Sequence, residues 1–221
     1  MKKLTAMLLT LILTLTFSLA FAEDAIRVGI IQMADNGAFT DMREGFMDRM
    51  RELGYDERQI ELARIAGFMH DIGNAINRTH HAEIGGLLAN DILKQTDMPL
   101  ADRIAVIAAI GQHDESTGGS KDPISAALIL ADKTDVRRNR VRTKDAVHFD
   151  IHDSVNYAVT GSTLKVDTEK DIIALNLQID ESICTMYEYF DIFLKRMLMC
   201  RSAAEMLGHT FRLTVNGGKV L

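Results

Sequence analysis

Hydrophobic and polar positions change their spacing several times along this chain, and the first segment is distinct. Residues 4–21 are apolar and uncharged behind a short basic start, and residues 20–22 have the small-x-small form of a cleavage site. This pattern predicts a cleavable signal peptide over residues 1–22. The alternative is an uncleaved membrane anchor, because the apolar length is just sufficient to span a bilayer.

The next segment, residues 23–57, has the pattern of one strand followed by one helix. Residues 27–33 form a β-branched run that ends in turn-forming residues. Apolar residues then recur at helical spacing over residues 39–53, and Gly54 ends this helix. We predict a single βα unit here, which cannot cover its own strand without a partner.

From residue 59 to about residue 139 the spacing predicts consecutive amphipathic helices. Their apolar stripes are Ile60, Ala63, Met69 and Ile72, then Ile84, Leu88 and Ile92, then Ile104, Ile107 and Ile110. Asp122 and Pro123 suit the N-cap and first turn of a fourth helix. Residues 124–131 are a nearly unbroken apolar run that ends at Asp132.

The remainder of the chain mixes strands and a helix. Residues 163–166 and 172–179 alternate like two strands of a hairpin, residues 184–207 form one long helix closed by Gly208, and residues 211–215 suit a final strand. The outline is therefore an all-α domain over residues 58–142 and an α+β extension over residues 143–221.

Charge and cysteine content exclude some functions. The net charge of -6 over 221 residues argues against a nucleic-acid coat or an anionic-membrane binder. Cys184 and Cys200 are the only cysteines and have no CxxC spacing, which excludes a structural zinc knuckle. We expect both to be buried core thiols.

Histidines and carboxylates stand at the ends of the predicted helices. They are His70-Asp71, His80-His81, His113 with Asp114 and Glu115, and Asp132. A carboxylate at the buried end of an apolar helix is costly unless it is paired or bound to a metal. Each residue alone has a plain alternative, as a core or surface side chain. Together, imidazoles and carboxylates suit a divalent transition metal.

In this order, residues 62–74, His81, His113 and residues 131–133 resemble the HD superfamily of metal-dependent phosphohydrolases. The resemblance spans about residues 58–142, and the tail is similar to an extension on some bacterial members. It implies a mainly α fold: an HD-type helical bundle with a small C-terminal α+β extension, here preceded by a single βα unit. It also implies hydrolysis of a phosphate mono- or diester in a nucleotide-like substrate.

The resemblance implies a set of ligands. His70, Asp71 and Asp132 would bind the primary metal, and His81 and His113 a second ion in the binuclear branch, with Asp71 bridging. Mixed ligation favours manganese or iron, as one or two ions. Besides Asp71, the residues expected to act in catalysis, by orienting the attacking water or accepting its proton, are Asp114 and Glu115. A solvated helix end is an equal alternative for these two.

The basic residues after Asp132 are candidates for binding substrate phosphate, because guanidinium and ammonium groups match phosphate oxygens. They are Lys133, Arg137, Arg138, Arg140 and Arg142. A solvated charge run is the alternative. His148, His152 and His209 fall outside the pattern, and we expect structural or surface roles for them.

The sequence departs from the family at its N-terminal side. The family supplies one more histidine from the preceding helix, yet residues 23–69 contain none. Residues 1–53 instead resemble the start of an ABC-transporter substrate-binding protein. We hypothesise a chimera joined at residues 53–57. The alternatives to hydrolysis are therefore an impaired metal- or nucleotide-binding module and a fragment of an exported solute-binding protein.

Substrate, partners and location follow as expectations. The loop after His113 lacks the Gly-Tyr-Pro element of cyclic-dinucleotide phosphodiesterases, so that substrate is not supported. We expect a small phosphorylated substrate, no nucleic acid, and membrane association only through the signal segment; a homodimer is compatible with the sequence. The signal predicts export, whereas domains of this family mostly work in the cytoplasm.

Overall fold

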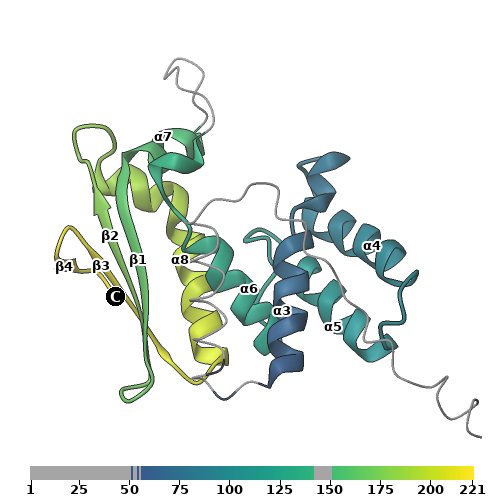
Figure 1. The fold of residues 1–221 in the computed structure, drawn as a ribbon. Coiled ribbons are helices and arrows are strands. Elements are labelled where there is room, and N and C mark those ends of the chain that lie inside the picture. The colour runs from purple at the N-terminus through teal and green to yellow at the C-terminus, as the bar shows by residue number, and fades with distance from the viewer. Residues whose placement is uncertain (1–50, 52–53, 55, 142–150) are drawn as a thin grey trace, which may run out of the picture. The chain divides into compact units, whose positions relative to one another are not determined.

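The computed structural model describes residues 51, 54, 56–141 and 151–221, which belong to one unit of the chain, residues 35–221 (Figure 1). The predicted signal peptide, nearly all of the βα segment, the junction at 53–57 except residues 54, 56 and 57, Arg142 and His148 lie outside the described residues. In this described part of the chain, no helix is long and apolar enough to cross a membrane.

Four helices form the first half of the described chain. They are α3 (Glu57–Met69), α4 (His81–Leu93), α5 (Leu100–Gly111) and α6 (Pro123–Lys133), with the 3-10 turn η1 (Ile72–Ala75) after α3. Side chains cap two of them, and the cap at Asp122 was predicted from the sequence. Asp56 accepts from the backbone N–H of Gln59 at 2.8 Å, and Asp122 from that of Ile124 at 2.8 Å. The mainly helical prediction is confirmed.

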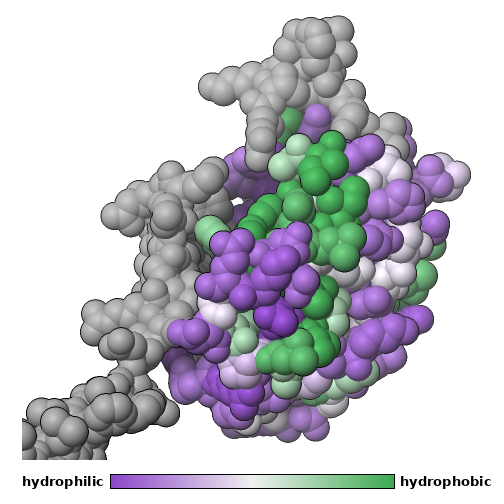
Figure 2. All heavy atoms as spheres, turned by 90° about the vertical axis from the view of Figure 1, so that its right-hand side faces the viewer, coloured by the Kyte–Doolittle hydropathy of each residue, from purple (hydrophilic) through white to green (hydrophobic). Residues whose placement is uncertain are grey.

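Helix α4 packs through small residues rather than through the branched stripe that its spacing suggested. Of the predicted stripe, Ile84 and Leu88 are half-buried and Ile92 is 45% exposed, and Figure 2 shows apolar surface on the side of the molecule where α4 and α5 lie. The buried face consists of Ala82, Gly85, Gly86, Ala89 and Leu93. A Cβ on Gly86 would lie 3.1 Å from the carbonyl oxygen of Ile107. The prediction of the core face was wrong for Ile92, because glycines allow a close helix contact that outweighs burial of larger residues.

Helix α6 is buried on both sides because it separates two hydrophobic cores. Ile124, Ala127 and Leu128 belong to the core shared with α3, α4 and α5. Ala126, Ile129 and Leu130 belong to the core shared with the C-terminal extension. An amphipathic helix needs one apolar face, so the unbroken apolar run of α6 follows from its central position.

The 3-10 turn η2 (Arg138–Arg140) follows α6, and the described part of the extension then consists of two helices and one sheet. Its elements are α7 (Ile151–Ala158), β1 (Val159–Asp167), β2 (Ile172–Ile179), α8 (Met186–Met206), β3 (Thr210–Val215) and β4 (Gly218–Lys219). Strand order is β1-β2-β3-β4. The pairs β1–β2 and β3–β4 are antiparallel, whereas β2 and β3 are parallel, joined through α8. The predicted hairpin, long helix and final strand are confirmed.

The inner face of the sheet packs with α8. Leu175 and Leu177 of β2 and Tyr189 and Phe193 of α8 are buried in the same core. Cys184 and Cys200 are free and buried in it too, as predicted. Burial raises the pKa of the Cys200 thiol to about 12, so this cysteine stays protonated and unreactive at neutral pH.

Candidate metal centre

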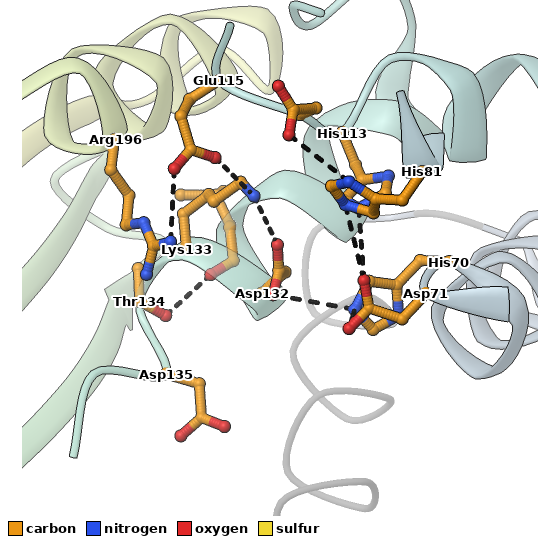
Figure 3. A network of polar contacts seen from close by, with 12 residues as sticks. His70, Asp71, His81, His113, Glu115, Asp132, Lys133, Thr134, Asp135 and Arg196 are labelled. Atoms are coloured by element: carbon orange, nitrogen blue, oxygen red, sulfur yellow. Dashed lines mark hydrogen bonds and ion pairs between the residues drawn. The ribbon is translucent and has the colours of Figure 1, made fainter. Parts of the chain in front are cut away.

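The ends of α3, α4, α5 and α6 bring all five predicted metal ligands together (Figure 3). Two follow the end of α3, one opens α4, one follows α5 and one lies in the last turn of α6. These residues are His70, Asp71, His81, His113 and Asp132. Their ligand atoms form two groups, each within 4.8 Å, and His113 belongs to both.

Asp71 faces both parts of this cluster. Its Oδ2 lies 3.6 Å from Nε2 of His70, whereas its Oδ1 lies 3.5 Å from Nε2 of His81 and 3.9 Å from Nε2 of His113. Oδ1 of Asp132 lies 3.7 Å from Nε2 of His70 on the other side. The two oxygens of Asp71 therefore face different histidines.

Backbone hydrogen bonds orient all three imidazoles in the same way. Nδ1 of His70, His81 and His113 lies 2.7, 3.0 and 2.6 Å from the carbonyl oxygen three residues earlier in each case. A carbonyl oxygen only accepts, so Nδ1 carries the proton and Nε2 of the neutral ring carries a free lone pair. Three lone pairs are therefore directed into the cluster, as metal-ligating histidines require.

The closest histidine pair tests whether the cluster fits a metal. Nε2 of His81 lies 3.1 Å from Nε2 of His113. Two neutral rings protonated at Nδ1 would place two lone pairs against each other, which is unfavourable without a cation between them. Two nitrogen ligands of one ion, about 2.1 Å from it and at about 90°, lie about 3.0 Å apart. The donor set therefore fits a divalent transition ion.

The carboxylates of the cluster are ionised at neutral pH. In the metal-free chain, the interactions with His113 and His70 lower the pKa of Asp71 to about 2 against the effect of burial. Burial raises the pKa of Asp132, but His70 and Lys133 outweigh it and hold this pKa well below its usual range. In the opposite direction, burial lowers the pKa of His70, and Asp132 and Asp71 raise it more. The cluster therefore offers negative charge to a cation.

Asp114 and Glu115 lie differently. Oδ2 of Asp114 is 3.7 Å from Nδ1 of His81, and its Oδ1 accepts from the backbone N–H of Ser116 at 2.8 Å. Glu115 pairs instead with Lys133 at 2.9 Å. Only Asp114 therefore lies directly beside the histidine cluster.

The structure gives the basic candidates protein partners. Lys133 is 4% exposed, and its Nζ lies 2.7 Å from Oδ2 of Asp132. Arg137 and Arg140 pair with Asp135 at 2.5 and 2.8 Å. Arg138 lies over the ring of Tyr157, 4.6 Å from its centroid, and donates to the carbonyl oxygen of that residue at 2.6 Å. Lys133 thus reaches the cluster, whereas the arginines bind other groups.

No role was predicted from the sequence for Arg196 of α8, which the structure joins to this region. Its Nη2 lies 3.2 Å from Oε1 of Glu115. One signal was available, because Arg196 follows Tyr189 and Phe193 at helical spacing and precedes Cys200, all buried in the extension core. A charge on such a stripe indicates a buried partner.

His152 and His209 have structural surroundings, as expected. The ring of His152 stacks on Phe193 with 5.9 Å between centroids. Nδ1 of His209 lies 2.7 Å from the carbonyl oxygen of Leu207, close after the end of α8. Neither belongs to a group of metal-ligand atoms among the described residues.

Comparison with known proteins supports the HD superfamily. A family model described as HD domain matches residues 43–148, a range that contains the five clustered residues. No curated protein and no solved structure matches the chain. These comparisons give no support to the substrate-binding-protein resemblance of residues 1–53, to a signal peptide or to a chimera.

Proposed function

We propose, from the HD domain at residues 43–148, that this protein hydrolyses a phosphate mono- or diester of a small nucleotide-like substrate with divalent metal. One observation carries the proposal. Three inward-facing imidazole nitrogens and two ionised carboxylates converge from four helix ends. Because the two ligand groups overlap at His113 and Asp71 faces both, the arrangement supports a pair of ions as well as a single one.

The residues of the chain have distinct parts in this reaction. A divalent ion bound here would supply Lewis acidity toward a phosphoryl oxygen and lower the pKa of a water molecule. Asp71 and Asp132 offset the charge of such an ion because both stay ionised. The backbone hydrogen bonds hold the neutral imidazoles in the tautomer whose Nε2 lone pair faces the cluster. Mixed histidine and carboxylate donors favour manganese or iron.

Of the two carboxylates predicted to orient the attacking water or accept its proton, Asp114 is the available one, with its Oδ2 beside Nδ1 of His81 rather than beside the ligand atom Nε2. It lies next to His81 but outside both ligand groups. Burial raises its pKa, and hydrogen bonds from Ser116 lower it more, so Asp114 is ionised at neutral pH. Glu115 is less suited to accept a proton because both of its oxygens are paired, one with Lys133 and the other with Arg196. We therefore assign the proton-transfer role to Asp114 alone.

The candidate for phosphate binding among the basic residues after α6 is Arg140, whose side chain is 48% exposed. Its Nη1 pairs with Asp135, and a guanidinium has five N–H groups. Lys133 is less suited, since it is buried between two carboxylates. A phosphate that approaches this loop would meet donors that are already oriented.

A second candidate is a domain that binds metal or nucleotide without turnover. The observation that favours it is the absence of histidine from residues 23–69, where the family supplies a further ligand. Changes outside the ligand shell weaken metal binding about 10–100-fold, and the loss of a direct ligand weakens it more. In that case the clustered residues would bind the metal or nucleotide as part of a sensor, without hydrolysis.

Metal content and activity together distinguish these candidates. We would purify the full chain without chelators, measure manganese, iron and zinc per chain, and assay a panel of phosphate mono- and diesters. We expect bound metal and hydrolysis, both lost in Asp71→Ala and retained in Asp91→Ala, whose carboxylate is exposed and pairs with Lys94. Metal without turnover would favour the second candidate. Hydrolysis unchanged by Asp71→Ala would show that this cluster is not the catalyst.

A further inference from the structure

A line of alternating charges leads from the metal ligand Asp132 to the extension (Figure 3). Oδ2 of Asp132 lies 2.7 Å from Nζ of Lys133. The same ammonium lies 2.9 Å from Oε2 of Glu115, whose Oε1 lies 3.2 Å from Nη2 of Arg196. The four residues come from α6, the loop after α5, and α8, so the line crosses from the helical domain into the extension.

The contact between Lys133 and Asp132 decides which oxygen of Asp132 faces the metal site. Lys133 holds Oδ2, which leaves Oδ1 directed at His70 at 3.7 Å. Without the ammonium, the carboxylate could rotate about its terminal bond, because that torsion has broad minima. Lys133 therefore restricts Asp132 to presenting one oxygen.

Lys133 depends in turn on a second carboxylate. Its side chain is buried, and a buried ammonium is unfavourable unless its donors are paired. Glu115 supplies that pair, and the charges of Lys133 and Arg196 overcome burial and lower the pKa of Glu115 to about 2. The lysine is thus held between two carboxylates that pull it in different directions.

Arg196 fixes the far end of the line. Its guanidinium lies 4.3 Å from the centroid of the Phe193 ring, so the side chain is held by stacking as well as by charge. It takes the Glu115 oxygen that Lys133 does not use. Removing Arg196 would free that oxygen to compete with Asp132 for the lysine.

We propose that Arg196 is a positioning residue for the metal centre, acting through Glu115 and Lys133 on Asp132. The extension then contributes to metal affinity although none of its described residues belongs to a ligand group. This inference rests on the proposed metal site and adds a dependence on α8. On this proposal the extension supports the metal centre and does more than cover α6.

Metal affinity of the full chain tests the inference, with Mn²⁺ as the probe and a fluorescent chelator as competitor. We expect Arg196→Met to raise the Mn²⁺ dissociation constant about 10–100-fold, as changes outside the ligand shell do. Arg196→Lys keeps a charge for Glu115 and should recover most of the loss. Glu115→Gln should weaken binding as well, and Arg196→Met should add nothing in that background, because the two act in one line.

Arg201→Met is the matched control on the same helix, since Arg201 is exposed and pairs only loosely with Glu205 at 3.9 Å. It should leave the dissociation constant unchanged. If the wild-type chain binds Mn²⁺ and Arg196→Met binds it equally well, the inference is overturned and the metal site stands. Additive losses in the double variant would also overturn it. A wild-type chain that binds no Mn²⁺ would overturn both. If Arg196→Met does not fold, Arg196→Lys and Glu115→Gln, alone and combined, carry the same comparison.

Discussion

The ion pairs of Glu115 predict that wild type and Glu115→Gln differ in free energy of unfolding by an amount that depends on pH. Its pKa is lowered from 4.5 to about 2 by Lys133 and Arg196, against the effect of burial. By linkage, this difference between the unfolded and folded pKa corresponds to about 3 kcal/mol of folding free energy above pH 5. Because the folded-state pKa is the lower one, this stabilisation is complete above about pH 5 and is lost as pH falls from 4.5 toward 2. Glu115→Gln should therefore lose about 3 kcal/mol at neutral pH.

Urea denaturation of both proteins at several pH values between 7 and 3, with a chelator present, measures this difference. The gap between wild type and Glu115→Gln should stay constant from pH 7 to about pH 5.5 and narrow steadily below pH 4.5. Glu205→Gln, an exposed position on α8, should stay within about 0.5 kcal/mol of wild type. A gap that is absent at pH 7, or equally large at pH 3, would refute the reasoning.

Three further predictions concern the metal cluster. His81→Ala should lose bound metal, whereas His80→Asn, at an exposed left-handed position one residue earlier, should retain it; equal metal content by elemental analysis would contradict this. Gly85→Ala should cost about 1–3 kcal/mol and weaken metal binding, because its Cβ would lie 3.2 Å from the backbone of His70. Gly67→Ala, which meets nothing within 4 Å, should be neutral or stabilising in the same melts. Adding Mn²⁺ should raise the melting temperature of wild type but not of Asp71→Ala, and parallel shifts would count against the site.

Local sequence signals predicted the helices and strands well, because their causes lie within a few residues. Asp56 and Asp122 cap helices through hydrogen bonds to N–H groups two or three residues later. The hairpin of β1 and β2 follows from alternation on either side of a turn. The buried face of α4 was predicted only in part. The close approach at Gly85 and Gly86 depends on the neighbouring elements, which the local sequence of α4 does not specify.

The sequence by itself determined the composition of the candidate site. The order of His70-Asp71, His81, His113 and Asp132 at helix ends, with its resemblance to the HD superfamily, was sufficient to predict that they meet. Only the tertiary structure decided how the charged residues around this site pair with one another. Glu115 and Arg196 stand 81 positions apart, and which of their oxygens and nitrogens meet depends on the rotation of α8 against α6. That rotation results from packing in a core shared by many residues, so no short stretch of sequence encodes it.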